Sequence, residues 1–328
     1  MTSDADGGLS VTVFQSFVFR SGAFGPLPFD SRLLMFTGKS VPLRAFFGHH
    51  KCATGWINSI LSEMCFHMGR RFLRVNQDKE FEGWRSLAAY LREEKTELVA
   101  YNNAKAEPLQ GLPLHRGVHV VRDPRDILVS AYFSHLHSHQ TKHWPELIPH
   151  RKRLQKLSEE EGLLCEMDFS HQQFKDMLHW DYAQENVLEL KMEELTQAPV
   201  RGFREIMAFL GWLAAPKRDA ERWKERVFLL LNRVTYKAHH TLSPALIPPY
   251  LCPLPGLSPK GVERFVKRYS FSKLSGGREK GEENKKSHYR KGKAGDWKNH
   301  FTDEHRRVFK ERYNDLLVEL GYETDANW

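Results

Sequence analysis

The segment from Gly48 to Trp56, GHHKCATGW, places a lysine among small and hydroxyl-bearing residues. It follows an apolar run at Arg44–Phe47 and precedes apolar residues at helical spacing, a pattern that indicates a strand, a loop and a helix. The first N–H groups of a helix lack intrahelical partners and favour an anion. Lys51 adds a positive charge and Thr54 a hydroxyl donor. The loop therefore predicts a site for phosphate or sulfate, although it lacks the glycine spacing of a Walker motif.

A second charged turn, RDPRD at 122–126, follows the strand-like run Gly117–Val121. A helix is expected to begin near Pro124. Arg122 thus lies, like Lys51, at the carboxyl end of a predicted strand, where open parallel sheets bind their ligands. A guanidinium suits the forked hydrogen bonding of a terminal phosphate. The two positions predict two separate cationic clusters.

Strand-like and helix-like segments alternate along the chain. This alternation predicts an α/β fold, a single domain with a central parallel β-sheet flanked by helices. Besides the segments above, strands are expected at 71–75, 98–101 and 187–190, and helices at 83–93, 146–164, 168–181, 200–210, 219–232, 261–269 and 302–320.

Three stretches differ from this alternation. Residues 1–40 are interpreted as an N-terminal extension, and the domain spans 41–328 with an irregular Pro-rich insertion at about 234–260. Between Leu274 and His288 glycine and charged residues predominate, which predicts a mobile segment. Such a segment is either a lid over a ligand or a solvated loop.

The composition sets the class of protein. The chain has 328 residues, 41% of them hydrophobic, which is sufficient for the core of a large domain. Its formal net charge of +8 favours an anionic partner without choosing among nucleic acid, membrane and small molecule. We find neither a secretory signal nor an apolar run of membrane-spanning length, and the four cysteines lack disulfide or zinc spacing. These features predict a cytoplasmic protein.

The stretch RKGKAGDWKNHFT at 290–302 strongly resembles the cofactor-binding signature of the cytosolic sulfotransferases, which use 3′-phosphoadenosine 5′-phosphosulfate (PAPS). The Lys51 loop resembles the 5′-phosphosulfate loop of that family, and VVRDPRDILVSAYF at 120–133 resembles its 3′-phosphate segment. The resemblance implies a P-loop nucleotide-hydrolase-like fold, PAPS as sulfuryl donor and no metal. The acceptor would be a hydroxyl or amine of a small molecule, with neither nucleic acid nor membrane as partner, and a homodimer stays open.

The resemblance also implies which residues contact the donor. Contacts with the 5′-phosphosulfate would come from Lys51, Ala53, Thr54 and Gly55; contacts with the adenine from Trp56, Tyr269 and Phe271; contacts with the 3′-phosphate from Arg122, Ser130, Arg290, Lys291 and Gly292. As a fixed cation, Lys51 would be catalytic because negative charge grows on the bridging oxygen as the sulfuryl group leaves. The loop reads KCATGW where the family typically shows Lys-Ser-Gly-Thr-Thr-Trp, so Gly55 replaces a hydroxyl donor.

The catalytic base departs from the family pattern. Family members usually carry a Lys-Thr-His-Leu-Pro stretch whose His is the base, but here the strand end reads AYNNAK and places Asn103 near that position. An amide does not take up the acceptor proton usefully. We favour His135 as the base, with His137, Asp78 and Glu80 as other candidates. Alternatively, the acceptor is an amine or an acidic hydroxyl that needs less assistance.

Other interpretations stay open. His135, His137 and His139 could suggest a metal site, but the sequence offers no nearby Cys or carboxylate to complete one. His49 and His50 are interpreted as solvated turn residues, with ligand contact as the alternative. The protein could instead be a non-catalytic nucleotide-binding relative of the sulfotransferases. A phosphate-loop kinase is disfavoured because no Walker lysine–serine pair or magnesium-binding aspartate is found.

Overall fold

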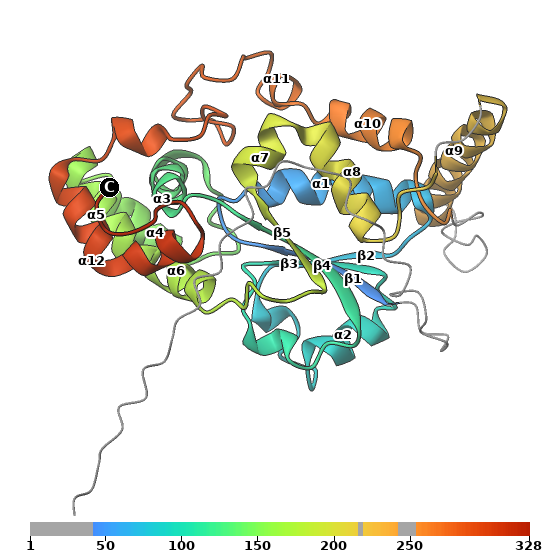
Figure 1. The fold of residues 1–328 in the computed structure, drawn as a ribbon, viewed down its shortest axis with the longest axis horizontal. Coiled ribbons are helices and arrows are strands. Elements are labelled where there is room, and N and C mark those ends of the chain that lie inside the picture. The colour runs from blue at the N-terminus through green and yellow to red at the C-terminus, as the bar shows by residue number, and fades with distance from the viewer. Residues whose placement is uncertain (1–41, 216–218, 242–253) are drawn as a thin grey trace, which may run out of the picture.

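Five parallel strands form the centre of the molecule, in the order β2, β3, β1, β4, β5 (Figure 1). Their bounds are β1 (Leu43–Gly48), β2 (Phe72–Val75), β3 (Leu98–Asn102), β4 (His115–Val121) and β5 (Val187–Lys191). The structure is a computed structural model that describes residues 42–215, 219–241 and 254–328. The N-terminal extension predicted for residues 1–40 lies outside these ranges.

The register of the sheet brings the predicted site residues to one edge. Gly48 at the end of β1 pairs with Asn102 of β3 on one side and with Val120 of β4 on the other. The chain therefore leaves β1, β3 and β4 at the same edge of the sheet, and this places the loop after β1 close to Asn103 and Arg122. With β1 in the middle and leading into the loop and helix, this is the predicted P-loop nucleotide-hydrolase-like α/β fold, which the structure confirms.

Helices cover both faces of the sheet (Figure 1). The helices are α1 (Thr54–Met68), α2 (Leu87–Glu93), α3 (Pro124–Phe133), α4 (Leu147–Leu154), α5 (Glu159–Phe169), α6 (His171–Leu178), α7 (Met192–Gln197), α8 (Pro199–Phe209), α9 (Asp219–Thr241), α10 (Pro259–Arg268), α11 (Phe271–Leu274) and α12 (Asp303–Glu319). One core cluster joins the sheet to α1, α8 and α10, a second joins α3, α5, α6 and α12, and a third joins the other sheet face to α2. No helix of the described residues is long and apolar enough to cross a membrane.

Helix α1 is positioned by its apolar face and starts without a side-chain cap. Ile57, Ile60, Leu61 and Met64 are fully buried, which fixes the helix against the sheet. At its start, Ala53 adopts a left-handed conformation with φ of 57° and makes no capping side-chain hydrogen bond. The first N–H groups of α1 are therefore directed at the loop after β1.

Two of the predicted helices differ from the structure because a side-chain cap starts a helix at another residue. The helix expected at 83–93 begins at Leu87, because the Ser86 side chain accepts a hydrogen bond from the Ala89 N–H and caps it there. The helix expected at 146–164 is divided into α4 and α5, because Ser158 forms a capping box with Glu161 and starts a new helix.

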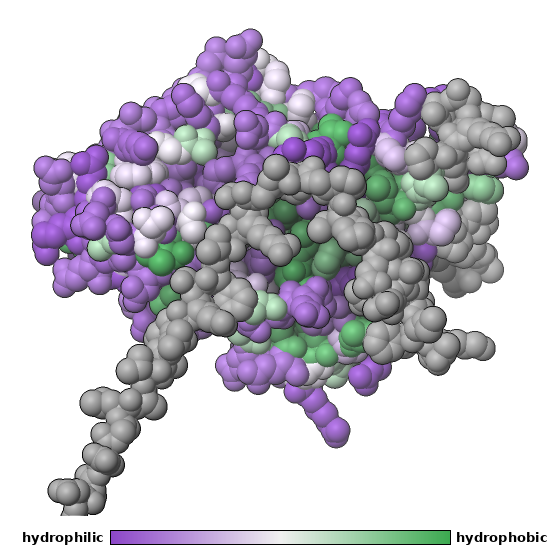
Figure 2. All heavy atoms as spheres, in the orientation of Figure 1, coloured by the Kyte–Doolittle hydropathy of each residue, from purple (hydrophilic) through white to green (hydrophobic). Residues whose placement is uncertain are grey.

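The beginning of the predicted irregular insertion is helical. Helix α9 continues to Thr241, so the expectation of irregular structure from about residue 234 is wrong for its first part, and residues 242–253 lie outside the described ranges. α9 exposes large apolar side chains at Trp223, Leu230 and Val234. Figure 2 shows hydrophilic residues predominating over α5 and α12 and hydrophobic residues gathering toward α9.

Candidate functional site

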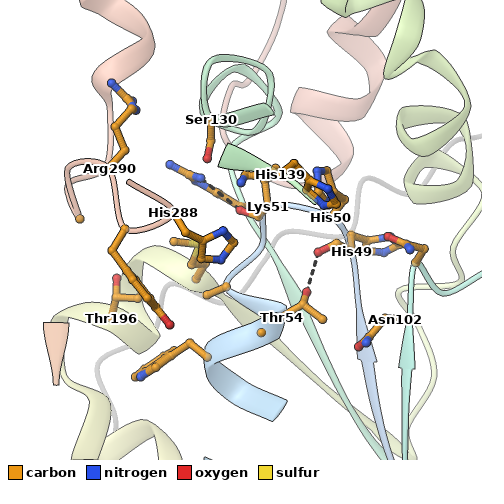
Figure 3. A pocket seen from close by; sticks show the side chains of 18 of the residues that line it. His49, His50, Lys51, Thr54, Asn102, Ser130, His139, Thr196, His288 and Arg290 are labelled. Carbon is orange, nitrogen blue, oxygen red and sulfur yellow. Dashed lines mark hydrogen bonds between the residues drawn. The ribbon is translucent and has the colours of Figure 1, made fainter. Parts of the chain in front are cut away.

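A cavity of about 1210 Å³ opens at the carboxyl ends of the strands. The predicted donor-binding residues and the favoured base His135 all line it. They are Lys51, Ala53, Thr54, Gly55, Trp56, Arg122, Ser130, His135, Tyr269, Phe271, Arg290, Lys291 and Gly292. Figure 3 shows Lys51 near the centre, with His288, Thr196 and Arg290 on one side and His49, His50 and Asn102 on the other.

The loop after β1 surrounds the start of α1 with donors and positive charge. Lys51 has a positive φ of 65° and its carbonyl accepts a hydrogen bond of 3.1 Å from Arg122. The Thr54 hydroxyl donates to the His49 carbonyl at 2.6 Å, which closes the loop. Burial, reinforced by the charges of Arg122 and Arg290, lowers the pKa of Lys51 to about 7. No acidic side chain of the described residues pairs with Lys51, so the loop is a cationic site suited to an anion.

The predicted adenine residues form one wall. The Trp56 indole donates a hydrogen bond of 2.8 Å to the Tyr269 carbonyl and packs edge-to-face on Phe203. Gly292 has a φ of 66°, and a Cβ there would lie 2.6 Å from the Phe271 ring. Only glycine therefore lets the segment at 290–302, here called the signature segment, approach Phe271 this closely.

The predicted 3′-phosphate residues come from the turn after β4, from α3 and from the signature segment at 290–302. Asp126 joins the start of α3 to the signature segment. Asp126 accepts hydrogen bonds from the N–H groups of Gly295 at 2.7 Å and Trp297 at 3.0 Å. This carboxylate also lies 3.8 Å from the Arg122 guanidinium. The arrangement fixes the residues after Lys291 against the start of α3.

Arg290 and Lys291 already have acidic partners. Arg290 pairs with Glu283 and with Asp296 at 2.5 Å, and Lys291 pairs with the other oxygen of Asp296 at 2.5 Å. Burial alone would raise the pKa of Asp296, but hydrogen bonds from His300, Lys291 and Arg290 lower it. Both cations line the cavity, so their charge there is partly balanced.

The segment at 274–288, predicted to be mobile, is organised around Arg278. Its guanidinium donates to the carbonyls of Ser275, Glu282, Tyr289 and Arg290 and to the hydroxyl of Ser287. This network connects the segment to the signature at Arg290, and His288 lines the cavity.

A chain of histidines leads from the cavity into the protein. The Nε2 atoms of His50 and His135 lie 3.0 Å apart, and Nδ1 of His135 lies 3.0 Å from a Glu166 oxygen. Glu166 is fully buried and also interacts with His150 at 2.8 Å and with the Ser170 hydroxyl at 2.9 Å. Both ring nitrogens of His135 therefore have partners. The other end of this series of histidines is His50, which directly precedes Lys51 in the sequence.

A second series of hydrogen-bonded histidines starts at His49, one residue before His50. Nε2 of His49 lies 2.8 Å from Nε2 of His119, whose Nδ1 lies 2.6 Å from Glu189. The Trp180 indole donates to the other Glu189 oxygen at 2.9 Å. His49 is buried, which corrects its interpretation as a solvated turn residue, and its Nδ1 has no partner among the described residues.

The remaining candidate bases are placed differently. Asn103 is exposed and donates to the Asn76 carbonyl at 3.2 Å. Asp78 pairs with Lys105 at 2.6 Å and accepts from the Tyr101 hydroxyl at 2.5 Å. Glu80 lines the cavity. His137 is exposed and does not line it.

Sequence analysis missed the carboxylates of both histidine chains. It found no acidic residue to accompany His135, whereas the structure places His135, His150 and Glu166 within 4.8 Å of one another. Glu166 lies on α5, thirty-one residues along the chain, where a helix carries many glutamates and nothing distinguishes this one. The adjacent histidines beside Lys51 were the signal that could have indicated the chains. Hydrogen bonds link Glu166 to His135 and to His150.

A family model described as the sulfotransferase domain matches residues 112–239 and 252–321. Similar solved structures include a mouse sulfotransferase, SULT7A1, complexed with PAP, which is 15% identical with a TM-score of 0.44 over 87% of this chain and 90% of that chain. Another is retinol dehydratase in complex with androsterone and inactive cofactor PAP, at 14% identity and a TM-score of 0.42 over 84% and 82%. No curated protein matches the chain. On the family match, which covers more than half of its residues, the chain belongs to the sulfotransferase family.

Proposed function

We propose that the protein is a PAPS-dependent sulfotransferase that moves the sulfuryl group to a hydroxyl or amine of a small-molecule acceptor. The observation that carries the proposal is the partly buried Lys51 at the uncapped start of α1, in the same cavity as Arg122 and the signature segment. Two cationic clusters in one cavity fit a ligand with phosphate groups at both ends.

The residues present fit such a nucleotide. Burial lowers the pKa of Lys51, and a bound anion would stabilise its charged form. In the bound state PAPS supplies the activated sulfuryl group. The backbone N–H groups of Ala53, Thr54 and Gly55 at the start of α1 would hold the 5′-phosphate, Arg122 and Ser130 the 3′-phosphate, and Trp56 the adenine.

His50 is our choice of general base, with His135 as the residue that positions it. If Nδ1–H of His135 donates to Glu166, its Nε2 accepts from Nε2–H of His50, and Nδ1 of His50 keeps a lone pair for the acceptor proton. With PAPS supplying the sulfuryl group, Lys51 would stabilise the negative charge left on the bridging oxygen as its bond to sulfur breaks. His50 would take the proton of the acceptor as the acceptor forms the new bond to sulfur.

The experiment is transfer of radiolabelled sulfate from PAPS to a panel of phenols, alcohols, sugars and amines, with PAP binding measured separately by calorimetry. Transfer that falls by 10²-fold or more in Lys51→Ala, with a smaller loss of PAP affinity, supports the proposal. Binding without transfer to any acceptor would instead favour the non-catalytic relative. Absence of PAP binding would refute the nucleotide assignment.

The cellular setting belongs to the same proposal. Cys52, Cys65 and Cys165 are free thiols, as expected in a reducing compartment, so we assign the protein to the cytoplasm. Its partners would be small molecules, and a homodimer remains a prediction for solution measurements.

A further inference from the structure

The cavity has two halves of different chemistry on either side of Lys51. The half toward α10, α11 and the signature segment includes the apolar side chains Met192, Val200, Val266 and Leu274. The other half extends from His50 past the ends of β2 and β3 to α6. Its walls are rich in carboxamides, namely Asn76, Gln77, Asn102, Asn103, Gln140 and Gln172.

The carboxamide half holds few apolar groups. Among the described residues that line it, none is Leu, Ile, Val or Met. Its carbon-rich side chains are the aromatic rings of Trp144 and Phe169, which stack with centroids 5.4 Å apart and an angle of 27°. Trp144 also meets the His50 ring edge-on at 5.5 Å. A firmly held aromatic ring thus lies beside the proposed base.

Such walls match one class of acceptor. A carboxamide both donates and accepts hydrogen bonds, as does a hydroxyl group. A steroid or simple phenol would displace water from the carboxamides without replacing the hydrogen bonds of that water, which disfavours its binding. A sugar pairs them through its hydroxyls and can place its C–H face on an aromatic ring.

We infer that the acceptor is a hydroxyl-rich molecule of the carbohydrate class, bound between the carboxamides and Trp144 with one hydroxyl at His50. This inference rests on the proposed function and specifies its acceptor. Glu80 and Asp176 line the same half and would accept hydrogen bonds from further hydroxyls, or from the ammonium group of an amino sugar.

The test compares two groups of acceptors with the full chain and PAPS. The carbohydrates are glucose, lactose, trehalose, N-acetylglucosamine and glucosamine; the apolar acceptors are 4-nitrophenol, 2-naphthol and oestradiol. We expect kcat/KM for at least one carbohydrate to exceed that for every apolar acceptor by tenfold or more. The double variant Gln77→Leu, Gln140→Leu should lower carbohydrate transfer at least tenfold and leave the PAP dissociation constant unchanged.

Gln110→Leu is the matched control, because Gln110 is exposed and lies outside the cavity. It should leave transfer to every acceptor unchanged. Three results would overturn the inference while PAP still binds: transfer to apolar acceptors alone, transfer to no carbohydrate, or a double variant with unchanged carbohydrate kinetics. Loss of PAP binding in the unaltered protein would refute the proposed function itself, so the two failures are distinguishable.

Discussion

Lys51 is a cation whose charge depends on what lies beside it. Burial and the neighbouring Arg122 and Arg290 lower its pKa to about 7, so in the free protein it loses its proton as the pH rises through neutrality. A bound phosphate raises that pKa again, because an opposite charge favours the protonated amine. Binding of an anion and protonation of Lys51 are therefore coupled.

The first prediction follows from this coupling. Above pH 7 the free protein must take up a proton to bind PAP, so the dissociation constant should rise about five- to tenfold between pH 7.5 and 8.5. Lys51→Arg should abolish this slope, because a guanidinium stays charged. Calorimetry at both pH values measures it, and this range avoids the phosphate's own ionisation near pH 6. An equal slope in the variant would contradict the assigned coupling.

Gly55 gives a second prediction at the same scale. Its φ is not in the left-handed region, and a Cβ there would meet no atom within 4 Å, so a side chain can be added without strain. Gly55→Thr should supply the hydroxyl that the family pattern carries and tighten PAP binding about two- to fivefold, since a charge-assisted hydrogen bond at an exposed site contributes about 1 kcal/mol. Gly55→Ala adds the methyl group without the hydroxyl. If both variants bind alike, the hydroxyl has no role.

At the scale of secondary-structure elements, the position of the proposed base His50 depends on three segments. His50 follows β1, His135 lies in a π-helical turn at 134–138 after α3, and Glu166 lies on α5. The third prediction is that His50→Asn lowers kcat 10²–10⁴-fold with little change in PAP affinity. Burial lowers the pKa of His50 well below 6.5, so in the unaltered protein kcat should fall only at distinctly acidic pH, as the base becomes protonated.

His179→Asn serves as its control, because His179 is exposed and lies outside the cavity. Rates measured from pH 5 to 8 test the assignment. A variant at His50 that retains full turnover and the same acid limb would show that the base is elsewhere. The unpartnered Nδ1 of His49 would then be the next site to test.

The segment around Arg278 carries the fourth prediction. Because one guanidinium holds five acceptors between residues 275 and 290, Arg278→Ala should release this segment and the adjoining Arg290. Limited trypsin digestion should cut within 280–291 at least tenfold faster, and PAP should bind more weakly. The control is Arg307→Ala, because Arg307 is exposed on α12 and lies outside this segment. Unchanged digestion would mean that the segment is held by other contacts.

At the scale of the whole molecule, the bound nucleotide should stabilise the fold, because it would contact residues from distant parts of the chain. The fifth prediction is that PAP at 100 times its dissociation constant stabilises the protein by about 2.7 kcal/mol. For a domain of this size the melting temperature should rise by about 4 °C. Differential scanning calorimetry measures it, and adenosine 5′-monophosphate at equal concentration should give a smaller rise. An equal rise would remove the 3′-phosphate contacts from the account.

Sequence reasoning predicted the features that depend on residues close together in the sequence. The strand, loop and helix around Lys51 and the turn at Arg122 follow from local periodicity and from residue types, and parallel pairing then places both at one edge of the sheet. The break between α4 and α5 was missed because a capping box at Ser158 overrides continuous helical spacing. Glu166 and Glu189 were missed because their partners lie 31 and 70 residues away in sequence. Such pairs are defined only by packing.

The contact between Asp126 and the N–H groups of Gly295 and Trp297 also bears on how the protein is made. Lys51 and Arg122 leave the ribosome early, yet Asp126 finds its partners only after residue 297 has been synthesised. A nascent chain that ends before this point has the phosphate loop but not the segment that closes on α3. Nucleotide capture should therefore wait until residue 297 has been synthesised, so a product truncated before this residue would not sequester the donor.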